Sequence, residues 1–289
     1  RIRLKDIGRK KLMKSLSNSL RKILITWRNI NKMNIEVKRT VKAGNSSAVI
    51  LPRAWLNQEV RVELVKKTPE IILYETLKIV SRYIDTKEII GIYLAGSYAR
   101  SEESSESDID LLIITFDVDK EMIHNNMYNI LIVSEKLLKW KLENDLLPIG
   151  PMIAEAVPLI NGSYLGDIEV EATDKNLKWY INTTKDKLKL IRRALDNTKG
   201  KLANSVIYTL VLRIRTLYII RKLIDDEKYS KKEFVKLIAR VSGSDRVYEA
   251  YVLVKNDLDK SALVTKEEAE KLYVYLARQL SEVVSLLKK

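Results

Sequence analysis

The chain has 289 residues, which is enough for two or three domains, and it contains no cysteine, which excludes disulfides and thiolate metal sites. The single histidine, His124, excludes sites built on several histidines; we expect it on the surface or at a helix cap and assign it no catalytic role. No apolar run approaches the ~20 residues of a membrane-spanning helix, and no secretory signal is evident. We therefore expect a cytoplasmic protein.

The net charge of +14 is concentrated in the first quarter of the chain. Residues 1–67 contain 18 Lys and Arg against 4 Asp and Glu, whereas the remainder contains 34 of each kind. A basic segment of this kind commonly contacts nucleic acid or another anionic surface. We therefore expect the basic N-terminal quarter to contact nucleic acid or another anionic surface.

Residues 1–32 are the most basic part, with 11 basic residues and one acidic residue. Apolar residues recur at helical spacing from Leu12 to Ile30, which fits a basic amphipathic helix on DNA, a membrane surface or a partner groove. The alternative is a weakly ordered extension, or sequence upstream of the true start, because the chain begins with Arg1 and Met33 stands where the next module begins.

Residues 33–67 have the pattern of a small β module. Segments 35–41, 47–52 and 60–64 predict short strands, with Gly44-Asn45 as the turn between the first two and a short turn at 53–56. A segment this short buries too little apolar surface to fold alone and would gain by pairing with a second copy. We therefore expect a homodimer.

This module, VKAGNSSAVILPRAWLNQEVRVELV, resembles the AbrB-like swapped-hairpin family in a form common in small archaeal proteins. The resemblance implies a dimer that binds DNA through basic loops and strand edges. Lys38, Arg39, Lys42 and Arg53 are the residues that we expect on phosphates. The alternative is a dimerisation module whose charges are only solvated.

Residues 89–116, IIGIYLAGSYARSEESSESDIDLLIITF, contain the strongest functional signal. Two apolar runs predict buried strands, and between them Gly96-Ser97 ends the first strand and begins a helical turn. Residues two apart on a strand point to the same face, so Asp108 and Asp110 project together while Ile109 enters the core. Paired carboxylates repel unless a cation lies between them or one takes a proton, and Mg²⁺ favours one or two carboxylates plus substrate phosphates.

The segment GSYARSEESSESDIDLL resembles the polymerase-β-like nucleotidyltransferase superfamily, whose signature is Gly-Ser at a strand end and Asp-x-Asp on the next strand. One departure is Ser101, where many members have Gly. The resemblance implies that Asp108 and Asp110 bind two Mg²⁺ ions, with Mn²⁺ as an alternative. It also implies that Gly96, Ser97 and Arg100 bind the phosphates of a nucleoside triphosphate (NTP).

The same resemblance implies a third carboxylate, from a later strand. We expect residues 119–145 to be helical and residues 148–160, PIGPMIAEAVPLI, to form that strand, which makes Glu155 the catalytic and metal-binding candidate. The family more often has Asp at this point. The rivals are Asp167 and Glu169, which we place on a later helix or turn.

Pro69 predicts the start of a helix over residues 69–84 that covers the sheet. From residue 182 onward the pattern predicts a helical bundle, with a central helix over 202–223, an N-cap at Ser230 and a capping box from Thr265 to Glu268. The bundle resembles the helical domains of kanamycin nucleotidyltransferase-like and HEPN-type proteins. The HEPN ribonuclease motif needs a histidine, and none lies here, which argues against that activity.

The predicted fold class is therefore α+β: a basic extension (1–32), a β-hairpin module (33–67), a nucleotidyltransferase mixed sheet with flanking helices (68–181) and a helical bundle (182–289). The implied function is transfer of a nucleoside monophosphate from an NTP to an acceptor hydroxyl of a small molecule, a protein or an RNA end, with release of pyrophosphate. The alternative is a DNA-binding regulator or antitoxin-like protein in which the nucleotidyltransferase domain is secondary or inactive.

Overall fold

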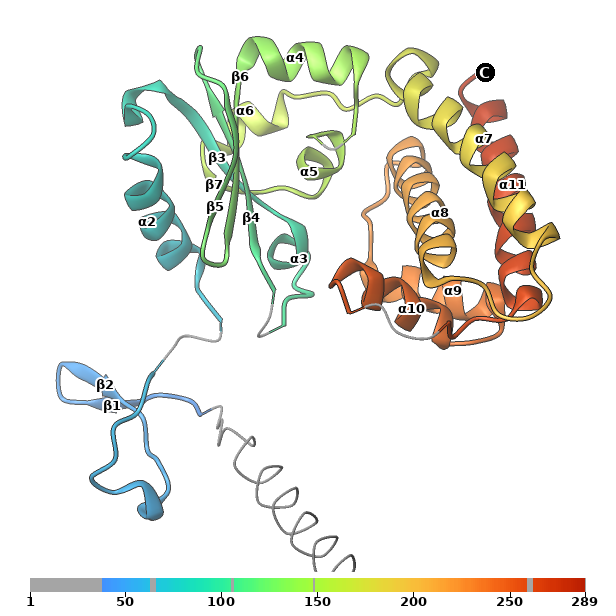
Figure 1. Ribbon diagram of the computed structural model, residues 1–289. Helices are drawn as coiled ribbons and strands as arrows, with labels where there is room; N and C mark the ends of the chain where they lie inside the picture. The colour runs from blue at the N-terminus through green and yellow to red at the C-terminus, as the bar shows by residue number, and fades with distance from the viewer. Residues whose placement is uncertain (1–37, 63–65, 105–106, 148, 259–261, 289) are drawn as a thin grey trace, which may run out of the picture. The chain divides into compact units, whose positions relative to one another are not determined.

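The structure is a computed structural model that describes residues 38–62, 66–104, 107–147, 149–258 and 262–288 (Figure 1). It divides into two compact units, Arg1–Val65 and Lys66–Lys289. The basic extension predicted over residues 1–32 lies outside the described residues. Within the described ranges, no helix combines the length and the apolar composition that crossing a membrane requires.

In the first unit, β1 (Val41–Ala43) and β2 (Ser46–Ala48) form an antiparallel hairpin. Gly44 has φ +60° in the connecting turn, which confirms the predicted Gly44-Asn45 turn and explains why glycine suits this position. A short 3₁₀ helix, η1 (Arg53–Trp55), follows. All residues of the two strands are exposed, so the hairpin has no buried core of its own.

The third strand predicted for this unit does not form where the structure describes it. Residues 60–62 are irregular, and residues 63–65 lie outside the described residues. The predicted strand over 35–41 is shorter than expected in its described part, because it begins at Val41. A strand needs a neighbour for its backbone N–H and C=O groups, and β1 and β2 form a sheet of only two strands in the described part of this unit.

The second unit is organised around a five-stranded mixed sheet with the order β5-β6-β4-β3-β7. Its strands are β3 (Ile89–Ala95), β4 (Ile109–Thr115), β5 (Lys120–Asn125), β6 (Tyr128–Ser134) and β7 (Val157–Ile160). Strands β4 and β6 are parallel, and the other neighbouring pairs are antiparallel. The apolar runs that predicted two adjacent buried strands are confirmed as β3 and β4.

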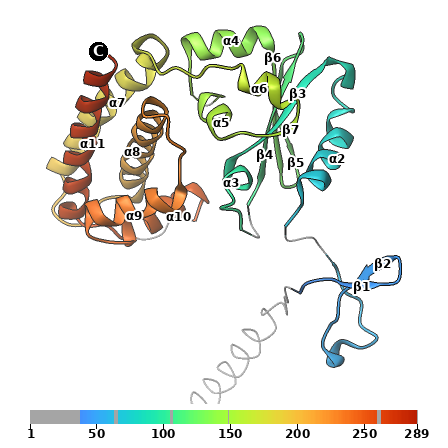
Figure 2. The same ribbon diagram turned by 180° about the vertical axis from the view of Figure 1, so that it is seen from behind.

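Helices cover both faces of this sheet (Figures 1 and 2). Helix α2 (Pro69–Val80) packs on one face, against a core that includes Ile109, Leu111 and Ile113, as the pattern from Pro69 predicted. Helices α4 (Glu135–Asn144) and α5 (Ile149–Glu155) pack on the other face, against a core that includes Leu112 and Ile114. Because side chains alternate along β4, Asp110 belongs to the face that α4 and α5 cover.

The prediction of a helix over residues 119–145 is wrong in its first half, where β5 and β6 form a hairpin. Asn126 adopts φ +51° in the two-residue turn between them, a conformation that asparagine tolerates better than most residues. Ile130 and Ile132 then fill the sheet core. Tertiary burial of these β-branched side chains outweighs the helix-forming residues around them.

The strand predicted over 148–160 is also wrong in its first half, because residues 149–155 form α5 and only 157–160 form β7. Pro151 lies in the first turn of α5, where a backbone N–H would have no partner within the helix. Pro158 lies in β7, which is an edge strand and therefore tolerates a missing N–H. Glu155 consequently stands at the end of a helix rather than on a strand. The short helix α6 (Gly162–Gly166) follows.

The remainder is a helical bundle, as predicted, although its first helix begins at Asp174 rather than after residue 182. Its helices are α7 (Asp174–Asp196), α8 (Asn204–Ile224), α9 (Lys231–Ser242), α10 (Arg246–Lys255) and α11 (Lys266–Leu286). Helix α8 packs against α7, α9, α10 and α11, which confirms the expected central helix. The N-cap at Ser230 and the capping box from Thr265 to Glu268 are both present.

The sheet and the bundle are joined by Glu102, which follows the one-turn helix α3 (Gly96–Ala99). Its carboxylate accepts hydrogen bonds from the Ser230 hydroxyl at 2.7 Å and from the Lys231 N–H at 3.1 Å. It also accepts one from Arg100 Nε at 3.1 Å. Because Ser230 is the N-cap of α9, Glu102 extends that cap from outside the bundle.

Replacement of Glu102 by Gln should lower the free energy of unfolding by about 1–2 kcal/mol at pH 7. Burial alone would raise the pKa of Glu102, but the hydrogen bonds from Ser230, Lys231 and Arg100 together lower it. The stabilisation is therefore present above the unfolded-state pKa of about 4.3 and is lost as the pH falls through the lower folded-state pKa.

Urea titrations at neutral and acidic pH test this, with Glu121→Gln on β5 as the control, because Glu121 is exposed. The difference between wild type and Glu102→Gln should shrink at acidic pH. An equal loss in both variants would contradict the interdomain cap.

Candidate active site

Polar residues from three neighbouring strands meet at one end of the sheet. The strand register pairs Asp110 with Ala95 of β3 on one side and with Asn129 of β6 on the other. Gly96-Ser97 follows Ala95 directly and leaves the sheet there, as predicted from the Gly-Ser step. The Gly-Ser turn, Asp110 and Asn129 therefore lie side by side.

Gly96 is required at this point for two reasons. Its φ is +68°, and a Cβ atom there would lie 2.1 Å from Oδ2 of Asp110. No side chain larger than hydrogen fits without moving the aspartate. Ser97 next to it is half-buried, and its hydroxyl makes no hydrogen bond to the residues that the structure describes. The turn thus holds the Gly96 backbone directly against the Asp110 carboxylate.

The two aspartates differ in their surroundings. Asp108 is exposed immediately before β4, whereas Asp110 is half-buried within it. Burial raises the pKa of Asp110, and the neighbouring Asp108 charge raises it further, against a hydrogen bond from Asn129 that lowers it. Loss of hydration and repulsion both disfavour the ionised pair. A bound cation would relieve both effects.

Glu155 is held by two donors at the end of α5. Oε1 accepts a hydrogen bond from the Gly96 N–H at 2.6 Å, and Oε2 accepts one from Arg100 Nη1 at 2.5 Å. Burial raises the pKa of Glu155, Arg100 opposes this, and the charge of Asp110 adds to the increase. Glu155 therefore lies within the electrostatic influence of Asp110, but in this conformation it is the partner of Arg100.

The donor set can be compared with the Mg²⁺ that the resemblance implies. Within the described ranges, no three His, Asp or Glu side chains are grouped closely enough to hold a metal ion. Asp108 and Asp110 still fit, because Mg²⁺ in nucleotide enzymes takes one or two carboxylates and completes its shell with phosphates and water. Glu155, occupied by Arg100 and Gly96, does not join them as the structure stands.

The rival acids lie elsewhere in the second unit. Asp167 is the C-cap residue of α6, and Glu169 lies in the irregular segment that follows. The predicted DNA-binding residues belong to the first unit: Lys38 and Arg39 precede β1, Lys42 lies in β1 and Arg53 begins η1. All four are exposed.

Several residues near the site were not singled out by the sequence patterns. Asn129 donates a hydrogen bond from Nδ2 to Oδ1 of Asp110 at 3.1 Å. The Tyr229 ring lies under the guanidinium of Arg100, at 5.1 Å from its centroid. The charge of Lys255, at the end of α10, helps to lower the pKa of Asp110. Asn126, a residue type common in turns, was the available signal for the β5–β6 hairpin, and hence for the position of Asn129.

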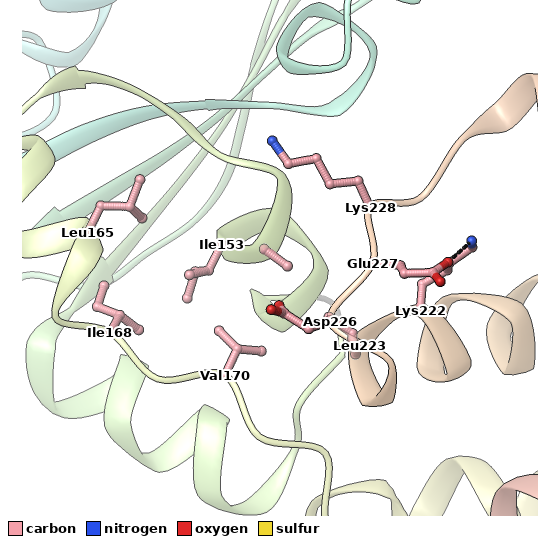
Figure 3. Close-up of a pocket in the computed structure, with 10 residues that line it drawn as sticks. Ile153, Leu165, Ile168, Val170, Lys222, Leu223, Asp226, Glu227 and Lys228 are labelled. Carbon is pink, nitrogen blue, oxygen red and sulfur yellow. Dashed lines mark hydrogen bonds and ion pairs between the residues drawn. The ribbon is translucent and has the colours of Figure 1, made fainter.

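A cavity of about 390 Å³ lies between the sheet domain and the bundle (Figure 3). One wall is apolar and comes from α5, α6 and the segment after α6: Ile153, Leu165, Ile168 and Val170. The opposite wall is charged and includes the Lys222–Glu227 ion pair and Lys228. A smaller adjoining hollow shares part of this lining and reaches Glu155 and Tyr229. The cavity therefore lies near Glu155 but is not itself lined by it.

Residues 73–198 match the family model described as a nucleotidyltransferase domain. Among solved structures, the chain is similar to a nucleotidyltransferase-like protein from Exiguobacterium sibiricum 255-15, with 16% identity, a TM-score of 0.35 and coverage of 75% of this chain and 77% of that one. It is also similar to spectinomycin adenyltransferase AAD(9) from Enterococcus faecialis, solved with ATP and spectinomycin, with 15% identity, a TM-score of 0.40 and coverage of 72% and 99%. A search of curated proteins gave no match.

The family match supports the resemblance of this domain to the polymerase-β-like nucleotidyltransferase superfamily. The matched residues include the whole five-stranded sheet together with the two aspartates and Glu155. The match does not reach the first unit, whose AbrB-like character stays a prediction.

Replacement of Gly96 by Ala should lower the free energy of unfolding by about 1–3 kcal/mol, because it adds backbone strain at positive φ and displaces Asp110. Gly166→Ala is the matched control, since a Cβ there meets nothing within 4 Å and its φ is not in the left-handed region. Urea unfolding of both variants tests the difference. A Gly96 variant as stable as the Gly166 variant would contradict the close approach to Asp110.

Proposed function

We propose that this protein is a metal-dependent nucleotidyltransferase that moves a nucleoside monophosphate from an NTP to an acceptor hydroxyl and releases pyrophosphate. The observation that carries the proposal is the close approach of the Gly96 backbone to Asp110, which sets a Gly-Ser turn beside the Asp110 carboxylate. The segment that matches the nucleotidyltransferase domain contains this contact. The domain limits predicted from the sequence, 68–181 and 182–289, are part of the proposal.

Asp108 and Asp110 would hold Mg²⁺, two ions by analogy with the superfamily, or Mn²⁺. When bound, the metal would neutralise charge on the phosphates and on the leaving oxygen. The Ser97 hydroxyl and Arg100 would bind the β and γ phosphates, and the Gly96 N–H would join them once Glu155 no longer accepts its hydrogen bond. Lys255 is a further cation whose charge reaches this site.

Glu155 would act as the general base. The acceptor hydroxyl would give its proton to this carboxylate while its oxygen bonds to the α-phosphorus and the bond to pyrophosphate breaks. Burial raises the pKa of Glu155, which makes it a better proton acceptor than an exposed carboxylate. We also propose that Glu155 helps to hold the catalytic metal, as the resemblance implies.

This role requires Arg100 to change partners. In the structure the Arg100 guanidinium is bound to Glu155 and Glu102 and stacks on Tyr229. A triphosphate carries more negative charge than either carboxylate and competes for the same guanidinium. Nucleotide binding would therefore release Glu155, so that the base becomes available only when the NTP is present.

The acceptor would enter through the cavity between α5 and the end of α8. The adjoining hollow that Glu155 lines is only about 10 Å³, so the acceptor hydroxyl would reach this carboxylate only if the hollow widens. The apolar wall and the charged wall of the cavity favour an acceptor with both apolar and polar surfaces.

Asp108→Asn and Asp110→Asn should each abolish transfer and leave the fold intact, because the amide loses the charge that holds the metal. The assay is transfer of label from α-³²P-NTP, tested with each of the four nucleotides in a cell extract with Mg²⁺. Asp117→Asn is the matched control, since Asp117 is exposed just after β4. Retained turnover in either purified active-site variant would refute the assignment.

For the first unit we propose a homodimeric DNA-binding role. Its exposed apolar side chains support pairing with a second copy, since Ile50, Leu56 and Val62 are 68%, 71% and 64% exposed. The exposed basic residues Lys38, Arg39, Lys42 and Arg53 support contact with phosphates.

Changing Lys38, Arg39, Lys42 and Arg53 together to Gln in the full chain should weaken DNA binding and flatten its salt dependence. The logarithmic slope should fall by about three to four, because each neutralised phosphate contributes about 0.9. A control with the same change in charge replaces four exposed lysines of the second unit, Lys136, Lys139, Lys175 and Lys178. Fluorescence anisotropy at several salt concentrations measures both. Equal losses would contradict a specific role for the first unit.

One observation favours a second candidate function, in which the protein is a DNA-binding regulator or antitoxin-like protein with an inactive nucleotidyltransferase domain. This observation is the concentration of positive charge in residues 1–67. NTP labelling separates the two functions, because an inactive domain transfers nothing whereas DNA binding persists.

A further inference from the structure

A row of hydrogen bonds crosses three neighbouring strands at the candidate site. The register pairs His124 of β5 with Asn129 of β6, and Asn129 with Asp110 of β4. His124 Nδ1 lies 2.8 Å from Asn129 Oδ1, and Asn129 Nδ2 lies 3.1 Å from Asp110 Oδ1. The row ends at one of the two carboxylates that we expect to hold the metal.

The chemistry of each group sets the direction of the row. A carboxylate only accepts hydrogen bonds, so the side of Asn129 that faces Asp110 must be its amino group. The carbonyl oxygen of the same amide then faces His124 and can only accept. His124 must therefore carry its proton on Nδ1 and donate it to Asn129.

The row also determines which oxygen of Asp110 remains available. Oδ1 accepts the hydrogen bond from Asn129, whereas Oδ2 is the atom that lies against Gly96. Oδ2 thus faces the Gly-Ser turn, where the phosphates are expected. A carboxylate with one oxygen held can present the other in a single orientation, which lowers the entropy cost of binding a metal.

We propose that Asn129 is a positioning residue for Asp110, and that His124 positions the Asn129 amide. The inference rests on the proposed function, because it assigns these residues to the metal site of the nucleotidyltransferase. It gives the only histidine of the chain a role that composition alone did not suggest. Neither residue touches the nucleotide: Asn129 acts on Asp110, and His124 acts through Asn129.

The first experiment tests the row itself and needs no metal. Because the chain contains one histidine, its ¹⁵N NMR spectrum contains one imidazole and needs no assignment. In the full chain at alkaline pH, where imidazole is neutral, we expect the Nδ1–H tautomer in wild type. Asn129→Leu should shift it toward the Nε2–H form. An Nε2–H tautomer in wild type would overturn the inference whatever the enzyme does.

The second experiment measures Mn²⁺ binding to the full chain by electron paramagnetic resonance. Asn129→Leu should raise the dissociation constant about 10- to 100-fold, the usual effect of removing a group that orients a metal ligand. His124→Ala should raise it in the same direction. His124→Gln should restore it in part, because the amide can donate the same hydrogen bond. His124 is exposed, so its variants should retain the fold.

A double variant separates positioning from a general effect on the sheet. Once Asn129 is Leu, His124→Ala should have no further effect on Mn²⁺ binding, because His124 acts only through Asn129. Met122→Ala on the same strand, also exposed, is the control and should bind as wild type does. Additive losses in the double variant would overturn the role of His124.

The outcomes distinguish this inference from the function on which it rests. A wild-type chain that binds no Mn²⁺ refutes the proposed metal site and this inference with it. If wild type binds Mn²⁺ and Asn129→Leu binds it equally well, the positioning role alone is overturned. The proposed enzyme function then stands.

Discussion

The candidate site depends on one close approach, that of the Gly96 backbone to the carboxylate of Asp110. The approach follows from the pairing of Ala95 with Asp110 between antiparallel strands, which sets the end of β3 against the start of β4. Everything else at the site is arranged around this contact. Ser97 follows Gly96, and Glu155 accepts a hydrogen bond from the Gly96 N–H. Asn129 donates a hydrogen bond to Oδ1 of Asp110, the oxygen that does not face Gly96.

The second constraint is the distribution of charge around Arg100. This guanidinium binds Glu155 and Glu102 and stacks on Tyr229, whose other cation partner is Arg215 of α8. Glu102 in turn caps α9. Hydrogen bonds to charged groups in a partly buried setting are stronger than those between neutral groups. The same residues that position the base candidate therefore also join the sheet domain to the bundle. A substitution of Arg100 would affect both the position of Glu155 and the contact between the two domains.

Local sequence patterns predicted the parts of the site that lie close together in the chain. Strand alternation placed Ile109 in the core with Asp110 on the opposite face, and the Gly-Ser step marked the end of β3. Capping residues such as Ser230 and Thr265 predicted helix starts for the same reason, since a cap acts within one turn. Ser101 adopts φ +56°, a backbone conformation that glycine adopts at lower cost than serine.

The predictions that were wrong concern residues whose positions depend on strand pairing, which the periodicity of the sequence does not determine. Asn129 contacts Asp110 only because β6 is the parallel neighbour of β4, and residues 119–134 resembled a helix by composition. Glu155 reaches Gly96 from the end of a helix rather than from a strand, because Pro151 is compatible with a first helical turn. The residue next to Asp110 on β6 is thus Asn129, whose amide donates a hydrogen bond to the aspartate. The third carboxylate, Glu155, lies at the end of α5 and is paired with Arg100. Under the proposed function, competition between a phosphate and Glu155 for Arg100 would therefore decide whether Glu155 is available as the base.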